Sequence, residues 1–570
     1  MLDQLAQHAA QQLRAGFDDY NDRFRAITQR ARARFERREW ALMQADLVER
    51  IELYDRCVAE ASAALLATLR EHAGERALWL RIKPAFEQAI RGLLDGELYQ
   101  TYYNTLTRRF FKTRGVDADI EFVALRIEPT DRITHPVARH SYSVGDSLAD
   151  SLDRLLEDYP FEVPYADRRA DAAALALDLE RRLTHWGERP IRAIEMLETV
   201  FYRERRAYLV GRIFGADRYA PIVIALNHHA DGGIGVDAVL TERDDVAVLF
   251  GITRSYFLAD FETVGDAVVF LKTLLPRKAV DEWYSMLGRL KQAKTERYRH
   301  FFRHFEQSPE CFVHAPGAKG MVMAVFTLPD YPLVFKVIRD HFAPPKTVAR
   351  QDVMNKYQLV FKHDRAGRLI DAQEFRHLRF PRSRFAPAVL EELLGGCRES
   401  VVADGDDVVL LHCYVERRLR PLNLLVMEDA PAIARRAILD YGQAIKDLAT
   451  CNVFPGDLLL KNFGVTRHGR AIFYDYDELC LVSECRFRDL PKAQNIDEEM
   501  HHGAWFHVDE HDVFPEQFPQ FLGLSADDRA ALLVTHSEIF TASWWRSLQD
   551  RFRAGDPPEI APYPDALRLR

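Results

Sequence analysis

A lysine inside an apolar run is the feature of this sequence that most constrains its fold. Lys336 lies within Leu333–Ile338, sixteen residues after a glycine-containing turn that ends at Gly320. An ammonium group among apolar side chains needs either water at an edge strand or a bound anion. Glycines let backbone N–H groups approach a phosphate closely, although most glycine turns only connect two strands. We interpret the pattern as a phosphate-binding loop followed by a lysine that contacts the same nucleotide phosphates. The loop consists of Ala315, Pro316, Gly317, Ala318, Lys319, Gly320 and Met321.

Two further segments supply carboxylate and amide groups. Asp457 and Asn462 are five positions apart, which is the D-x-x-x-x-N spacing of a kinase catalytic loop. This spacing lets the carboxylate face an attacking hydroxyl while the amide oxygen reaches a metal ion. Asp475 ends the apolar run Ala471–Tyr474, and hard oxygen ligands there suit Mg²⁺. The ordinary alternatives are helix capping and turn formation for Asp and Asn, and a solvated strand end for Asp475.

The four signals occur in the order found in kinases, and together they predict an α+β fold. We expect a bilobal protein-kinase-like catalytic domain over residues 311–570, with an interlobe hinge at Tyr414–Arg417. A mostly helical domain with a small β-sheet is expected over residues 1–310. Pro455-Gly456 precedes Asp457 where protein kinases have His-Arg. The motif therefore predicts phosphoryl transfer and leaves the acceptor open.

Two alternative functions remain open at this point. The Gly-Asp-x4-Asn form is as typical of small-molecule kinases of the aminoglycoside-phosphotransferase type as of protein kinases. The other alternative is a non-catalytic regulator that binds nucleotide without turnover. A scaffold, however, needs none of the four residues Lys336, Asp457, Asn462 and Asp475.

The N-terminal half has a different pattern. Good helix formers and apolar periodicity predict long helices over residues 1–110 and more helix over residues 147–208. The basic stretch Tyr202–Arg206 is interpreted as a solvated helix face. Short β-branched runs predict a small sheet over residues 208–261, with Val246–Phe250 as one of its strands.

Composition excludes several classes of protein. Seven cysteines without a CxxC pair argue against a disulfide framework and a zinc ribbon, and they favour a reducing compartment. A net charge of -9 argues against a general nucleic-acid binder. There is no signal-peptide pattern at the N-terminus and no apolar run of roughly 18 residues. We therefore expect a cytoplasmic protein that binds neither nucleic acid nor membrane.

Several long runs resemble one known family, the isocitrate dehydrogenase kinase/phosphatases. They include Ala315–Met323, Pro332–Ile338, Phe454–Arg470 and Phe473–Glu478, and the total length also fits. The resemblance implies a bifunctional enzyme that phosphorylates a serine of isocitrate dehydrogenase and removes that phosphate. Such an enzyme controls flux between the tricarboxylic acid cycle and the glyoxylate bypass.

The same resemblance implies the domain roles and the cofactors. The N-terminal domain would be regulatory, and the C-terminal domain would carry both activities. ATP or ADP and Mg²⁺ are the expected cofactors, with Mn²⁺ as the alternative metal. AMP is the expected allosteric effector, bound between the domains, and a homodimer is allowed. A role for the aromatic, basic run Glu97–Phe111 in contacting adenine and phosphate competes with a plain amphipathic core helix.

Three aspartates are the candidate catalytic residues. Asp457 would accept the serine proton. The resemblance gives an active-site role to Asp371, whereas the residues alone favour a helix N-cap there. Asp477 lies two positions after Asp475, and on a strand such residues share a face, so we expect it to position water for the phosphatase step. The alternatives for Asp477 are a second metal ligand and a solvated acid.

Two points stay unassigned by the sequence. Asp352 and Glu374 are the candidate ion-pair partners of Lys336, and neither is preferred. The late histidines are interpreted as a polar loop in preference to a metal site. The resemblance implies that this loop, up to Phe514-Pro515, helps to hold the protein substrate. These histidines are His501, His502, His507 and His511.

Overall fold

The computed structural model of this chain describes ten stretches of residues. They are 2–123, 136–187, 191–251, 257–342, 349–363, 365, 367–491, 506–509, 511–560 and 562–569. His501 and His502 lie outside these stretches. The chain divides into two compact units, each described separately below. Unit 1 comprises Met1–Gly251, Tyr256–Pro309 and Pro562–Arg570, and unit 2 comprises Ile252–Ser255 and Glu310–Ala561.

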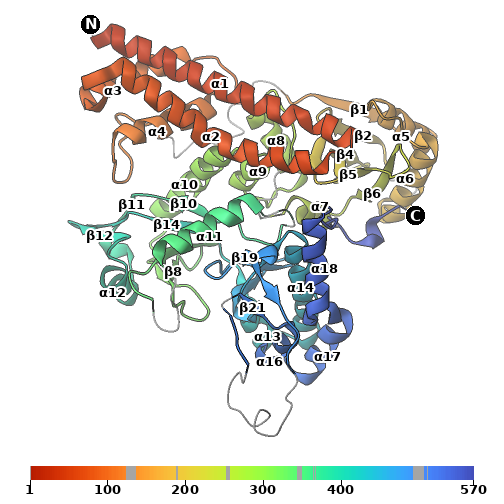
Figure 1. Ribbon diagram of the computed structural model, residues 1–570. Helices are drawn as coiled ribbons and strands as arrows, with labels where there is room; N and C mark the ends of the chain where they lie inside the picture. The colour runs from red at the N-terminus through yellow and green to blue at the C-terminus, as the bar shows by residue number, and fades with distance from the viewer. Residues whose placement is uncertain are drawn as a thin grey trace. The chain divides into compact units, whose positions relative to one another are not determined.

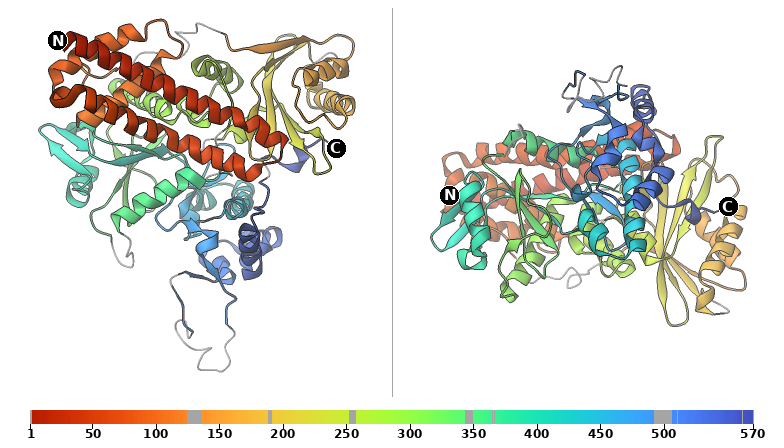
Figure 2. Two further views of the ribbon diagram at one scale, coloured as in Figure 1. Left: turned by 45° about the horizontal axis from the view of Figure 1, so that its top comes forward. Right: turned by 90° about the horizontal axis from the view of Figure 1, so that it is seen from below.

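Unit 1 begins with long helices. α1 (Leu2–Glu36) and α2 (Trp40–Leu69) run alongside each other, as the left view of Figure 2 shows. Apolar residues on one face of each helix form a common core with α3 (Arg76–Ala89) and α4 (Gly96–Phe110). The predicted helices over residues 1–110 are therefore confirmed, and their stability comes from this shared apolar face.

A six-stranded antiparallel sheet forms the second part of unit 1. The strand order is β1-β2-β4-β5-β6, and β3 pairs with β4. α5 and α6 pack together, and α6 also packs on β6. The strands are β1 Arg139–Ser143, β2 Ala193–Leu197, β3 Phe201–Arg203, β4 Arg206–Phe214, β5 Tyr219–His228 and β6 Ile234–Leu240. The helices of this region and the following one are α5 Leu148–Glu157, α6 Arg168–Arg182, α7 Arg243–Phe250, α8 Val264–Leu274, α9 Val280–Met286 and α10 Leu290–Gln307.

Three predictions for this region are wrong in detail. The helical stretch expected to reach residue 208 ends at α6, and the sheet begins earlier than expected. Val246–Phe250 belongs to helix α7, because a short apolar run does not distinguish a buried helix from a strand. The stretch Tyr202–Arg206 forms the β3–β4 hairpin and is not a helix face. Arg206 is buried there and pairs with Asp237 at 3.0 Å.

Unit 2 consists of two lobes. The first lobe contains a five-stranded antiparallel sheet of order β10-β14-β9-β8-β7, helix α11 (Arg350–His363) and a smaller sheet of order β11-β13-β12 that packs on α12 (Pro387–Gly396). The strands of the large sheet are β7 Val313–His314, β8 Met323–Thr327, β9 Leu333–Ile338, β10 Gln373–Phe375 and β14 Cys413–Arg417. Those of the small sheet are β11 Leu378–Pro381, β12 Val401–Asp404 and β13 Asp407–Leu410.

The second lobe is mainly helical and also contains one three-stranded sheet and two strand pairs. In Figure 1, α14, α17 and α18 lie together in this lobe, and α14 packs on both of the others. The helices are α13 Leu422–Glu428, α14 Pro431–Thr450, α16 Phe518–Phe521, α17 Ala526–Thr535 and α18 Ala542–Arg553. The strands are β15 Arg420–Pro421, β16 Val453–Phe454, β17 Phe463–Val465, β18 Ala471–Phe473, β19 Cys480–Leu481, β20 Arg486–Phe487 and β21 Asp512–Val513. The predicted α+β class is confirmed.

No helix among the described residues is both long enough and apolar enough to cross a membrane.

Candidate active site

Lys336 lies on a central strand of the first lobe. β9 is paired with β8 on one side and with β14 on the other, so the edge-strand alternative is wrong. The Lys336 side chain is 9% exposed, and its Nζ lies 2.6 Å from Oε1 of Glu416, whose side chain is 1% exposed. A buried ammonium group needs such an opposite charge because the protein interior solvates ions poorly. Nζ also donates a hydrogen bond to the carbonyl oxygen of Tyr474 at 2.7 Å.

The ion-pair partner of Lys336 is neither residue considered from the sequence. Glu374 pairs instead with Arg376 and His412, and the Asp352 carboxylate accepts a hydrogen bond from the backbone at the start of α11. Glu416 reaches Lys336 because β14 pairs antiparallel with β9 and places Tyr414 opposite Lys336. On one face of a sheet, the residue two positions along is a diagonal neighbour.

Asp457 is held in a loop that needs glycine at the preceding position. Gly456 has φ +81°, and a Cβ atom there would lie 2.5 Å from the Glu478 carbonyl oxygen. Oδ1 of Asp457 accepts a hydrogen bond from the Leu459 N–H at 2.9 Å. The Asn462 side-chain amide donates to the Asp457 carbonyl oxygen at 3.2 Å. The loop therefore fixes Asp457 and Asn462 relative to each other.

Tyr474 connects this loop to Lys336 and to Asp475. Its N–H donates to the Asn462 carbonyl oxygen at 3.1 Å, and its hydroxyl donates to the Lys461 carbonyl oxygen. Its own carbonyl accepts from Lys336, and Asp475 is the next residue. The four residues singled out by sequence order are therefore brought together around one tyrosine backbone.

Oxygen atoms suited to a hard cation are present at this point. The Asn462 amide nitrogen is used in its bond to Asp457, which leaves the amide oxygen as the ligand atom. Asp475 contributes a carboxylate from the segment directly after β18. An amide oxygen and a carboxylate are ligands that Mg²⁺ accepts, with water and phosphate oxygens completing the coordination. The two residues fit the expected metal.

Asp477 is half-buried and lies four residues after the end of β18. The prediction that it shares a strand face with Asp475 is wrong. β18 ends at Phe473, so Asp475 and Asp477 both lie in the irregular segment beyond it. Their spacing of two positions therefore does not by itself place them on one face.

Asp371 lies next to the segment that follows β18, because its neighbour Ile370 is bonded to that segment. Ile370 donates its N–H to the Phe473 carbonyl oxygen at 3.1 Å and accepts from the Tyr476 hydroxyl at 2.7 Å. Asp371 itself is buried and accepts a hydrogen bond from the Gln373 side chain at 3.3 Å. Strand β10 follows it, so the helix N-cap alternative is wrong. The structure thus brings Asp371 near the carboxylate segment that sequence spacing alone could not connect to it.

The loop Ala315–Met321 connects β7 to β8, and β8 is the direct neighbour of the Lys336 strand. The loop residues from Pro316 to Met321 are exposed. Gly317 has φ +117°, a left-handed conformation that favours glycine. Lys319 forms an ion pair with Glu392 at 3.0 Å.

Glu392 anchors this loop and was not considered from the sequence. Burial opposes ionisation of its carboxyl group, but hydrogen bonds from Arg339, Lys319 and His314 outweigh burial and lower its pKa to about 2. Arg339 also donates to the Gly320 carbonyl oxygen at 3.2 Å. The end of the loop is therefore tied to α12 through charge. Only the tertiary fold shows this, because α12 is far along the chain.

A pocket of about 450 Å³ lies beside the Asp457 loop. Aromatic and aliphatic side chains form most of its wall, and Asp457 and Glu478 border it. Phe521, which lines the pocket, is 65% exposed. The lining residues are Phe454, Gly456, Asp457, Leu458, Leu459, Glu478, Asp512, Val513, Phe514, Gln517, Phe518, Phe521 and Leu522.

The described part of the late histidine segment is a loop, as predicted. Residues 506–509 form neither helix nor strand, and His507 hydrogen-bonds to Asp509 at 2.8 Å. His511 precedes strand β21, which pairs in parallel with β20. The two histidines thus do not share a helix face.

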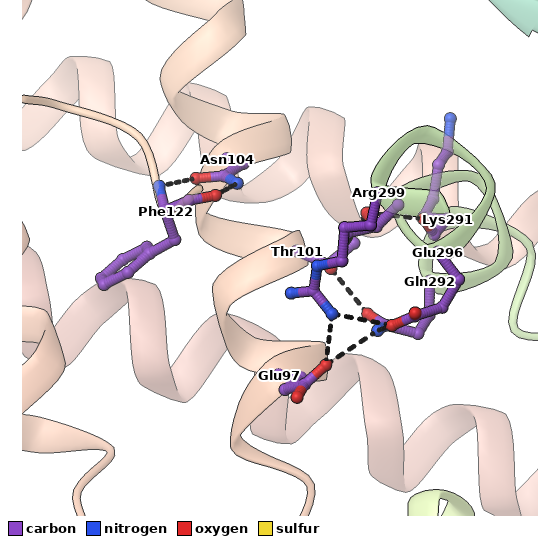
Figure 3. Close-up of polar contacts among 9 residues, drawn as sticks. Glu97, Thr101, Asn104, Phe122, Lys291, Gln292, Glu296 and Arg299 are labelled. Carbon is purple, nitrogen blue, oxygen red and sulfur yellow. Dashed lines mark hydrogen bonds and ion pairs between the residues drawn. The ribbon is translucent and has the colours of Figure 1, made fainter. Parts of the chain in front are cut away.

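The aromatic run of α4 packs as a core helix. Tyr102 and Tyr103 are fully buried, and burial raises their pKa above the ordinary value for tyrosine. The polar side of α4 meets α10 in a buried network (Figure 3). Thr101 donates to Gln292 at 2.6 Å, and Arg299 donates to both Glu97 and Glu296. The run Glu97–Phe111 therefore packs as an amphipathic core helix, which was the second of the two interpretations.

Comparison with known proteins agrees with this arrangement. The family model "Isocitrate dehydrogenase kinase/phosphatase (AceK), regulatory domain" matches residues 10–309, and the corresponding kinase-domain model matches residues 310–565. The isocitrate dehydrogenase kinase/phosphatase of Xanthomonas campestris pv. campestris (strain 8004) is 58% identical over 555 residues, which cover 97% of this chain and 96% of the relative. That of Anaeromyxobacter sp. (strain Fw109-5) is 46% identical over 567 residues, covering 99% and 98%. The prediction of a kinase-like domain preceded by a regulatory domain is confirmed. The chain belongs to the isocitrate dehydrogenase kinase/phosphatase family.

Proposed function

We propose that this protein phosphorylates a serine of isocitrate dehydrogenase and also removes that phosphate. By doing so it sets the flux between the tricarboxylic acid cycle and the glyoxylate bypass. The observation that carries the proposal is the convergence of Lys336, Asp457, Asn462 and Asp475 around the Tyr474 backbone. The names of the relatives supply the substrate.

The kinase step assigns one role to each residue. ATP lies under the loop of residues 315–321, and Lys336 contacts its phosphates. Asn462 and Asp475 would hold Mg²⁺, which would supply positive charge to neutralise the phosphates. Asp457 takes the proton from the serine hydroxyl. The serine oxygen bonds to the γ-phosphorus of ATP, and ADP departs. Positioning and charge neutralisation provide most of the acceleration in such reactions.

The phosphatase step uses the same cleft, within residues 311–570. Asp477 orients the water that attacks the phosphoserine, and Asp371 supports the catalytic segment from the opposite side. Substitution Asp477→Ala is then expected to lower phosphatase activity more than kinase activity. Equal loss of both activities would remove this role for Asp477.

The pocket beside Asp457 provides a place for the protein acceptor. Its wall is mostly apolar, and it borders the carboxylate that must meet the serine hydroxyl. A segment of isocitrate dehydrogenase with an apolar side chain next to the serine fits this combination. Burying such a side chain also holds the hydroxyl close to Asp457.

Four further properties stay predictions. They are Mn²⁺ as an alternative metal, AMP as an allosteric effector acting through the regulatory domain, a homodimeric assembly and a cytoplasmic location. The first three accompany the family resemblance and the location follows from the composition, and none is needed for the chemistry above.

Two other functions are separated from this one by a single experiment. The chain is incubated with isocitrate dehydrogenase, Mg²⁺ and ATP labelled at the γ-phosphate, with Asp457→Ala as the control. Label on the dehydrogenase that later disappears when ATP is replaced by ADP and AMP supports the proposal. Label only on a small molecule would indicate an aminoglycoside-type kinase, and no turnover at all would indicate a non-catalytic nucleotide-binding regulator.

A further inference from the structure

Two cysteines lie in contact just beyond the carboxylate segment of the active site. The Sγ atoms of Cys480 and Cys485 are 3.5 Å apart, and both residues are half-buried. Of the five other cysteines, four are buried, namely Cys57, Cys397, Cys413 and Cys451. A small reagent can therefore reach this pair more easily than most thiols of the chain.

The backbone between the two cysteines is already folded into a tight turn. Residues Val482–Glu484 form one turn of 3-10 helix, and the Leu481 N–H donates to the Glu484 carboxylate at 3.1 Å. Asn452 holds the turn from outside, because its side-chain oxygen accepts from the Ser483 N–H at 2.9 Å. A disulfide needs the sulfurs at about 2.05 Å. Little chain entropy is lost in reaching that distance, because the short loop is ordered beforehand.

We propose that Cys480 and Cys485 form a reversible intramolecular disulfide when the enzyme meets an oxidised low-molecular-weight thiol such as oxidised glutathione. The thiolate of Cys480 attacks one sulfur of the reagent, and one reduced thiol leaves. The Cys485 thiol then loses its proton and attacks the Cys480 sulfur of the mixed disulfide, and the second reduced thiol leaves. Two protein thiols are oxidised and one reagent disulfide is reduced, so the electrons balance.

The contact between the thiols supports this order of attack. The hydrogen bond between them lowers the pKa of Cys480 and raises the pKa of Cys485. A thiol of lowered pKa is the one present as the attacking thiolate. Cys485 is then positioned as the resolving thiol. Transient disulfides of this kind are the form expected inside a reducing compartment.

The state of this pair reaches the catalytic loop through direct backbone contacts. Cys480 pairs with Phe454 across the β16–β19 strands, and Gly456 follows two residues after Phe454. The backbone of Gly456 is packed against Glu478 so tightly that no Cβ fits between them. Drawing Cys480 toward Cys485 therefore shifts the support of Asp457. Misplacing a catalytic group by a fraction of an ångström lowers the rate.

Mass spectrometry tests the chemistry independently of any activity. Trypsin cleaves after Arg470 and Arg486, so both cysteines fall in the single peptide Ala471–Arg486. We expect this peptide, from full-length protein equilibrated with oxidised glutathione, to lose two hydrogen atoms and to regain them with dithiothreitol. In Cys485→Ser, the same peptide is expected to carry glutathione on Cys480 instead. Cys311→Ser, which removes a half-buried thiol elsewhere, leaves the result unchanged.

A second readout tests the coupling to the active site, and only this readout rests on the proposed function. The rate of ATP-dependent phosphorylation of isocitrate dehydrogenase is expected to fall at least about threefold as the disulfide forms. The double variant Cys480→Ser/Cys485→Ser keeps its rate in the same buffers. A wild-type peptide that retains two free thiols, or carries glutathione on both, overturns the disulfide. A disulfide that forms with no change in rate overturns the coupling.

Discussion

Gly456 offers the sharpest test of how the catalytic loop is built. In Gly456→Ala, the new Cβ would lie 2.5 Å from the Glu478 carbonyl oxygen, whereas ordinary contacts begin at 3.4 Å. The backbone must therefore separate by about 0.9 Å, the difference between these two distances. Backbone cannot rotate away as a flexible side chain can. The movement falls on the residue that precedes Asp457.

The expected magnitude has two parts. A non-glycine residue in the left-handed region costs about 1 kcal/mol of stability. A shift of about 1 Å at a catalytic group costs roughly 100-fold in rate, or about 2.7 kcal/mol of transition-state stabilisation. We therefore expect kcat for phosphorylation of isocitrate dehydrogenase to fall by roughly 100-fold in Gly456→Ala, with a modest loss of thermal stability.

Gly469→Ala is a matched control. Gly469 has φ +76°, close to the +81° of Gly456, but a Cβ there meets nothing within 4 Å. This variant carries the conformational cost without the clash, so its kcat should stay near that of the wild type. Steady-state rates and thermal melting of both variants decide the matter. A Gly456→Ala enzyme that melts like the control and works within threefold of it would refute the reasoning.

Three other predictions follow from buried or exposed groups. Glu416→Gln should weaken ATP binding and lower the unfolding midpoint, because breaking a buried ion pair costs roughly 3–5 kcal/mol when one charge is left alone. Titration calorimetry should show a much smaller effect on ATP binding for Glu374→Gln. Equal effects of the two substitutions would contradict the pairing of Glu416 with Lys336. Burial raises the pKa of Glu296 to about 7 from 4.5, so its stabilising contribution is complete below pH ~4.5 and is lost as pH rises through ~7. Lowering the pH from 8 to 6 should stabilise the wild type by roughly 1 kcal/mol more than Glu296→Gln in urea unfolding, and parallel curves would contradict this. Phe521→Ser should raise KM for isocitrate dehydrogenase about tenfold without changing KM for ATP. Met427→Ser, at an exposed residue outside the pocket, should change neither KM. A Phe521→Ser enzyme with a normal KM for isocitrate dehydrogenase would exclude this docking site.

The sequence predicted the order of the chemical groups well because each depends on local pattern. Lys336 in an apolar run, the Asp457–Asn462 spacing and Asp475 after a short strand are all visible within a few residues. The structure places these residues together, and their catalytic roles stay predictions. The α+β class followed from the same order of elements.

Features set by tertiary pairing could not be read from local pattern. Glu416 became the partner of Lys336 only through the pairing of β9 with β14, two strands far apart in the sequence. Asp371 was predicted to cap a helix because the residues after it carry no local signal for the short strand β10. Val246–Phe250 was assigned the wrong element because five apolar residues fit a buried strand and a buried helix equally well.

The central claim is that one nucleotide and metal site serves both directions of the reaction. Asp475→Asn tests it most directly, because the substitution keeps the side-chain size and removes the charge that the metal needs. The variant is assayed for phosphorylation of isocitrate dehydrogenase and for release of phosphate from phosphorylated isocitrate dehydrogenase. The account predicts that both rates fall together by at least about 100-fold. A variant that loses one activity and keeps the other would contradict a single shared site.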